Sequence, residues 1–244
     1  MNKTVVVSTT NNPDYYFYAP FVEKAWNALG WNLLVLITED VNEPDLKISN
    51  PETIVLKLPS IKDIKDATIA QAGRLYAANC LPDGTLLMTS DMDLIPLTDY
   101  WHPKIEDVTV YGFDLTGRTT YPMGYIAMSV ENWSAFMNLT GDFVADFKRD
   151  CAEINVAYSL DWEKWWNHDQ LLITKRLKPI ESKINFIDRG RVASGLALGR
   201  IDRADWFGTQ NQQWIDAHCE NNNVMHADKL NKFLTVFEKV YGKL

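Results

Sequence analysis

Residues 85–96 read TLLMTSDMDLIP and hold the pattern on which the fold prediction depends. The run Thr85–Thr89 is mostly aliphatic, which is typical of a strand buried on both faces of a sheet. Two acids, Asp91 and Asp93, follow at once, and Pro96 closes the segment. In open α/β sheets, ligands bind beyond the carboxyl ends of the strands. The segment therefore predicts an α/β sheet with a ligand site at this strand end.

Short apolar runs also alternate with helical patterns on both sides of this segment. In the first half, strands are predicted at Thr4–Thr9, Asn32–Thr38 and Thr53–Leu58, and helices at Tyr15–Leu29 and Lys65–Leu81. The second half predicts strands at Val108–Leu115, Tyr125–Ser129, Ile184–Ile187 and Trp214–His218, and helices at Glu131–Asn138, Asp142–Arg149, His168–Leu177 and Asp228–Tyr241. This order favours an open, mixed and mostly parallel sheet flanked by helices. Because no repeat and no linker interrupts it, we expect a single domain over residues 1–244.

The composition limits the classes of function that fit. Apolar residues make up 46% of the 244 residues, enough for a full core, and the formal charge is −8. Such an acidic chain argues against nucleic acid as a partner, because binding its backbone depends on Lys and Arg. Three cysteines without metal-like spacing are typical of reduced thiols. With no recognisable signal peptide or transmembrane segment, we expect a cytoplasmic protein.

Asp91 and Asp93 are candidate ligands for a hard divalent cation, Mn²⁺ or Mg²⁺. Such an ion completes its coordination with phosphate oxygens and water, and neutralises charge on a departing diphosphate. A simple strand-end turn is the alternative, since Asp is common there. Arg74 stands alone among small and apolar residues upstream. It could contact a nucleotide or one of the acids, or could be a surface arginine.

A helix of small residues with Arg74-Leu75, a turn, an apolar strand and Asp91-Met92-Asp93 before Pro96 resembles the nucleotide-sugar-dependent glycosyltransferases of the GT-A fold. Small bacterial and chlorella-virus members are the most similar. The resemblance implies a GT-A sheet whose residues 1–100 bind the donor nucleotide and whose residues 101–244 face the acceptor. It implies metal-dependent transfer of a hexose from a nucleoside-diphosphate sugar, first of all a UDP-sugar, to a glycan or another hydroxyl acceptor. Mn²⁺ or Mg²⁺ would be the cofactor.

The resemblance also implies roles for single residues. The donor-binding set is Thr9, Thr10, Asn11, Arg74, Ser90, Asp91, Met92 and Gly124. Within it, Thr9, Thr10 and Asn11 would seat the base and ribose, and Gly124 would let the sugar approach the backbone. Asp169 would lie beside the anomeric carbon, as a general base or as a stabiliser of positive charge. Alternatively, Asp169 only complements the dipole of the helix that it opens.

A third metal ligand is expected from a histidine late in the chain. His218 ends a predicted strand, the usual place for a ligand side chain, and we favour it. His226 is the alternative, because its His-x-x-Lys pattern resembles the end of the family's sequences. The candidate metal set is therefore Asp91, Asp93, His218 and His226, and either histidine could instead be a surface imidazole.

Three further alternatives remain open at this point. The basic segment Gly199–Trp206 could hold phosphate or acceptor, or could be an ion-paired loop. A sugar-phosphate nucleotidyltransferase would need a Gly-rich loop with Arg or Lys after the first strand, and Thr9–Pro13 has neither. A non-catalytic carbohydrate-binding protein on the same fold would need no metal, so the intact Asp91 and Asp93 favour an enzyme.

Overall fold

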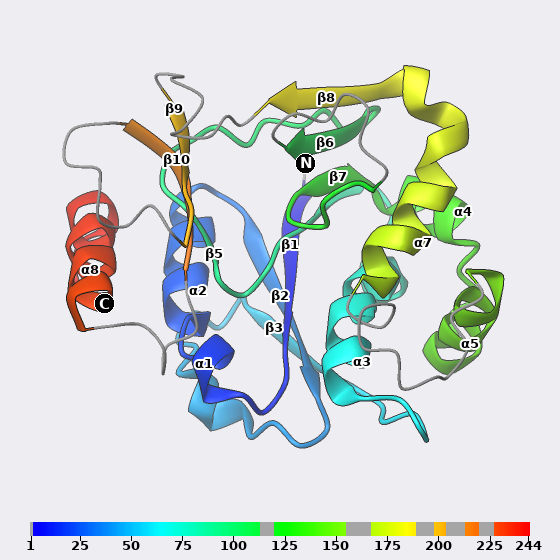
Figure 1. The fold of residues 1–244 in the computed structure, drawn as a ribbon, viewed down its shortest axis with the longest axis horizontal. Coiled ribbons are helices and arrows are strands. Elements are labelled where there is room, and N and C mark those ends of the chain that lie inside the picture. Colours follow the sequence, from blue (N-terminus) through cyan, green and yellow to red (C-terminus); the bar gives the residue numbers. More distant parts are fainter. Residues whose placement is uncertain (1, 113–119, 155–166, 189–197, 204–212, 220–226) are drawn as a thin grey trace.

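The computed structural model describes residues 2–112, 120–154, 167–188, 198–203, 213–219 and 227–244. A seven-stranded sheet in the order β3-β2-β1-β4-β7-β6-β8 forms its centre (Figure 1). The strands are β1 Asn2–Thr9, β2 Asn32–Thr38, β3 Ile54–Leu58, β4 Thr85–Thr89, β6 Val108–Gly112, β7 Ile126–Ser129 and β8 Ile184–Asp188. Strand β7 is antiparallel to both neighbours, and the other pairs are parallel. The predicted α/β class with a mixed, mostly parallel sheet is confirmed.

Helices cover both faces of this sheet (Figure 1). The helices are α1 Pro13–Tyr16, α2 Ala19–Ala28, α3 Asp66–Gly73, α4 Val130–Met137, α5 Phe143–Glu153, α7 His168–Leu177 and α8 Ala227–Tyr241, with 3₁₀ segments η1 Glu43–Leu46, η2 Arg74–Cys80 and η3 Lys178–Lys183. Val5 and Val7 of β1 pack into one core cluster with α2 and α8, whereas Val6 packs into another with α3, η2 and α7. A strand flanked on both faces must be apolar at every position, which explains the continuous apolar runs.

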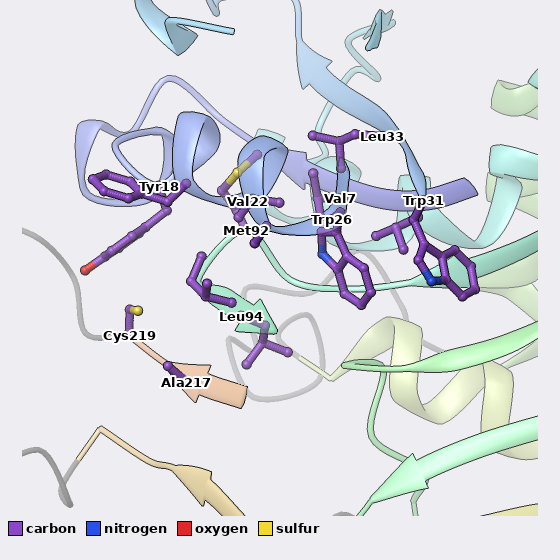
Figure 2. Packing of buried hydrophobic residues seen from close by; sticks show 14 of the residues in the cluster. Val7, Tyr18, Val22, Trp26, Trp31, Leu33, Met92, Leu94, Ala217 and Cys219 are labelled. Atoms are coloured by element: carbon purple, nitrogen blue, oxygen red, sulfur yellow. The ribbon is translucent and has the colours of Figure 1, made fainter. Parts of the chain in front are cut away.

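A smaller three-stranded sheet lies beside α2 and α8 and has the order β5-β10-β9. Its strands are β5 Leu94–Pro96, β9 Leu198–Ile201 and β10 Gln213–His218. Strand β5 runs antiparallel to β10, with Leu94 opposite His218, and Figure 2 shows Leu94 and Ala217 close together in the core. Since Leu94 directly follows Asp93, this register brings His218 beside the second aspartate. Only β10 was predicted, because β5 has just three residues and β9 contains a glycine and an arginine in place of an apolar run.

Two predicted helices are wrong in detail. The predicted helix Tyr15–Leu29 is two helices, α1 and α2, and Pro20 lies in the first turn of α2. Proline has no N–H and is tolerated only in a helix's first turn, so the chain restarts there. The predicted helix Lys65–Leu81 changes from the α-helix α3 to the 3₁₀ helix η2 at Arg74. Residues 113–115 of the predicted strand at 108–115 lie outside the described residues.

None of the helices in the described part of the chain combines the length and the apolarity that a membrane span requires.

Candidate functional site

The candidate site lies at a point where the direction of strand order reverses. From β1 the chain passes to β2 and β3 on one side and then returns to β4 on the other side of β1. Such a switch point leaves a crevice beyond the carboxyl ends of the two central strands. A cavity of about 340 Å³ lies there. Its wall comes from the ends of β1 and β4, from α3, from residues 122–125, from the start of α7, and from β9 and β10.

Arg74 connects two of the acids in this cavity. Its Nη1 donates to the carbonyl oxygen of Ser90 at 2.9 Å and contacts Oδ1 of Asp91. Its Nη2 donates to Oδ2 of Asp169 at 2.8 Å. Burial alone would lower the pKa of this guanidinium, but Asp91 and Asp169 together raise it. Arg74 is therefore a buried, charged link between the end of β4 and the start of α7, not a surface arginine.

Asp169 lies both at the start of a helix and in the cavity wall. It lies in the first turn of α7 and its Oδ1 accepts from the backbone N–H of Gln170 at 2.8 Å. It also lines the cavity and is only 3% exposed. Burial raises the pKa of its carboxyl group to about 6, partly opposed by Arg74. A carboxyl group with this pKa is mostly ionised at neutral pH and still basic enough to accept a proton.

Asp93 and His218 meet in the wall of the same cavity. Oδ2 of Asp93 lies 3.4 Å from Nε2 of His218 and also contacts Nη2 of Arg203. On the other side of the imidazole, Nδ1 of His218 lies 3.0 Å from Oδ1 of Asp202. Burial lowers the pKa of His218, but the hydrogen bonds to Asp202 and Asp93 outweigh it and raise the pKa overall. The imidazole is therefore held between two carboxylates.

Asp91, Asp93 and His218 could hold a divalent cation whose remaining coordination positions are filled by a bound ligand. Within the described ranges, no three side chains of His, Cys, Asp or Glu form a ready-made metal group. Adjacent ligands of an octahedral Mg²⁺ lie about 3 Å apart, close to the 3.4 Å between Asp93 Oδ2 and His218 Nε2. A metal-binding imidazole usually gives its other nitrogen to a carboxylate, as His218 does to Asp202. Asp91 lines the same cavity.

Gly124 and Arg200 form the wall next to Asp91. A Cβ atom on Gly124 would lie 3.0 Å from Leu94 Cδ1 and 3.7 Å from Asp91 Oδ2, so only glycine leaves this surface open. Arg200 lines the cavity, donates from Nε and Nη2 to Asp216 Oδ2 at 3.0 and 2.5 Å, and lies over the ring of Tyr125. The described part of the basic segment, residues 199–203, is therefore ion-paired, and its two arginines line the cavity.

Of the remaining predicted residues, some line the cavity and others do not. Thr9 and Thr10 line the cavity, whereas Asn11 is exposed and lies outside the wall. Ser90 is buried outside the wall; its N–H donates to Val6 and its carbonyl accepts from Arg74. Met92 contributes to the wall, but its side chain packs beside Val22 in the core (Figure 2). His226 lies outside the described residues.

Sequence reasoning missed several residues of the wall. Tyr15 and Gln71 line the cavity although no motif marks them. Gln71 lies three residues before Arg74, a spacing that places two helical side chains on the same face. Proximity to Arg74 was therefore an available signal for Gln71, but Tyr15 gave none.

In comparisons with known proteins, no family model and no curated protein sequence matches this chain.

Proposed function

We propose that this protein is a metal-dependent glycosyltransferase of the GT-A type. It transfers a hexose from a nucleoside-diphosphate sugar, first of all a UDP-sugar, to a glycan or another hydroxyl acceptor. The observation that carries the proposal is the convergence of Asp91, Asp93 and Asp169 on one cavity at the switch point of a mostly parallel sheet. Asp169 lies far along the chain from Asp91 and Asp93, so a local turn motif does not account for its meeting with them.

Asp91, Asp93 and His218 would hold the cation. When bound, Mn²⁺ or Mg²⁺ supplies Lewis-acid neutralisation of the leaving diphosphate. The protein's own contribution is to fix these ligands. Arg74 orients Asp91 through its Nη1, and Asp202 orients the ring of His218 through Nδ1. Thr9 and Thr10, at the end of β1, would then face the nucleoside part of the donor.

Asp169 would act at the anomeric carbon. Arg74 pairs with both Asp169 and Asp91, so one guanidinium would fix Asp169 relative to the diphosphate side of the cavity. As a carboxylate it could accept the proton of the acceptor hydroxyl or stabilise positive charge that develops on the sugar. The bare backbone of Gly124, on the Asp91 side, leaves room for the sugar ring.

The loop after β1 speaks against the nucleotidyltransferase alternative. Thr10, Asn11 and Asn12 lead directly into α1, and Asn12 caps that helix with its side chain. This connection has no glycine and no basic residue with which to surround a triphosphate. A transferase that only binds a finished nucleotide sugar has no need of such a loop.

Calorimetry with UDP-, GDP- and TDP-sugars, each with and without Mn²⁺, tests the proposal. We expect Mn²⁺-dependent binding of a UDP-sugar that Asp93→Asn abolishes. The matched control is Asp99→Asn, because Asp99 is an exposed acid that pairs with His102 outside the cavity wall. Metal-independent nucleotide binding, or none, would contradict the proposal. Slow release of UDP from the bound donor then separates an enzyme from a protein that only binds sugars.

A further inference from the structure

Oδ2 of Asp93 already has a cationic partner. Nη2 of Arg203 contacts Oδ2 of Asp93, the same oxygen that lies 3.4 Å from His218 Nε2. A divalent ion held by Asp93 and His218 would need this oxygen, and a guanidinium beside it would repel the ion. The metal and Arg203 therefore compete for Asp93.

Arg203 is the cavity arginine that is free to leave its partner. Among the described lining residues, Arg74 is buried and held by four acceptors, and Arg200 is buried against Asp216. The side chain of Arg203 is instead 42% exposed. Its Nε donates to the carbonyl of Cys219 at 3.1 Å, which keeps the guanidinium at the cavity when Asp93 is released.

We propose that Arg203 pairs with Asp93 in the metal-free protein and transfers to the donor's diphosphate when Mn²⁺ or Mg²⁺ takes Asp93. A guanidinium released beside a cation needs an anion, and a diphosphate offers oxygens that match its two parallel N–H groups. The inference rests on the proposed function and adds its regulation. A metal ion that binds alone must break the Arg203–Asp93 pair, and a diphosphate that binds alone meets an Arg203 that is already paired. Each ligand therefore promotes binding of the other.

Titration of Mn²⁺ by calorimetry, with and without saturating UDP, measures this coupling. The variants are Arg203→Gln, which removes the competing charge, and Arg203→Lys, which keeps the charge without the paired N–H groups. Lys178→Gln is the control. It also removes one positive charge, but from an exposed pair with Glu181 that lies outside the cavity wall. Thermal unfolding of each variant verifies that the fold is retained.

For Arg203→Gln we expect Mn²⁺ alone to bind about fivefold or more tightly than to the wild type, within the range of typical coupling factors. In Arg203→Gln, the gain in Mn²⁺ affinity on adding UDP should shrink by a similar factor. Arg203→Lys should keep part of this gain, and Lys178→Gln should keep all of it. Equal or weaker Mn²⁺ binding by Arg203→Gln, with metal-dependent UDP binding intact in the wild type, overturns the exchange alone. Absence of Mn²⁺ and UDP binding in the wild type overturns both this inference and the proposed function.

Discussion

Replacing Arg74 with methionine should destabilise the fold by an amount that grows with pH. Methionine keeps an unbranched apolar stem but loses the bonds to Ser90, Asp91 and Asp169. Removing one partner of a buried ion pair costs about 3–5 kcal/mol. Asp169 can avoid part of this cost by taking up a proton. The loss of stability therefore depends on pH.

The magnitude follows from the pKa of Asp169. In the folded protein this pKa is about 6, against a usual value of 3.8. A raised carboxyl pKa favours the folded state below pH 3.8, and this contribution is lost as the pH rises towards the folded pKa. Arg74 lowers the pKa of Asp169, so this pKa should be higher in Arg74→Met. The variant therefore continues to lose stability as the pH rises above 6, whereas the wild type no longer does. Between pH 6 and the higher pKa that Asp169 has in Arg74→Met, the difference in unfolding free energy should grow by about 1.4 kcal/mol per pH unit.

Urea unfolding followed by circular dichroism between pH 5.5 and 8 measures this difference. The set comprises the wild type, Arg74→Met, Asp169→Asn and the double variant. Since Asp169→Asn removes the titrating group, the effect of Arg74→Met in that background should no longer change with pH. Two results would refute this reasoning and assign the effect to packing. One is a loss of unfolding free energy that is equal at every pH, and the other is a pH dependence that persists in the double variant.

Three further outcomes follow from the site. The rate of sugar transfer should fall about tenfold per unit as the pH drops below about 6, where Asp169 takes up a proton, and Asp169→Asn should lose both the activity and this limb of the pH–rate profile. Asp202→Asn should weaken Mn²⁺ binding about 10- to 100-fold in a calorimetric titration, because it loosens the ring of His218. Gly124→Ala should raise the donor KM with little change in the melting temperature, since the end of the Leu94 side chain can shift by a few tenths of an ångström; an unchanged KM would place the sugar elsewhere.

The central strands and the first half of the site could be predicted because their signals are local. A strand buried on both faces is a continuous apolar run, so β2 and β4 have the predicted bounds. Asp91 and Asp93 follow such a strand, and the end of a parallel strand is where ligands bind. Arg74 was noticed for a related reason, because a charge is conspicuous among small and apolar residues.

The second half of the site depends on contacts between distant segments. His218 reaches Asp93 through the pairing of β5 with β10, and β5 has only three residues. Asp202 was not singled out, since its role exists only once β9 lies beside β10. The break of the predicted helix at residues 15–29 could have been read from Pro20, whose position in a first turn is a local signal.

The balance of charge in the cavity explains why the protein would depend on a metal for its donor. Three aspartates and three arginines are among the described lining residues, namely Asp91, Asp93, Asp169, Arg74, Arg200 and Arg203. Their charges cancel, and each of these arginines already has a carboxylate partner. A doubly charged diphosphate therefore gains little from the cavity by itself, despite its arginines. A divalent cation would supply the two missing charges and, by taking Asp93, would also release Arg203 for the phosphate. The proposed metal dependence would thus follow from ion pairs that the protein forms with itself.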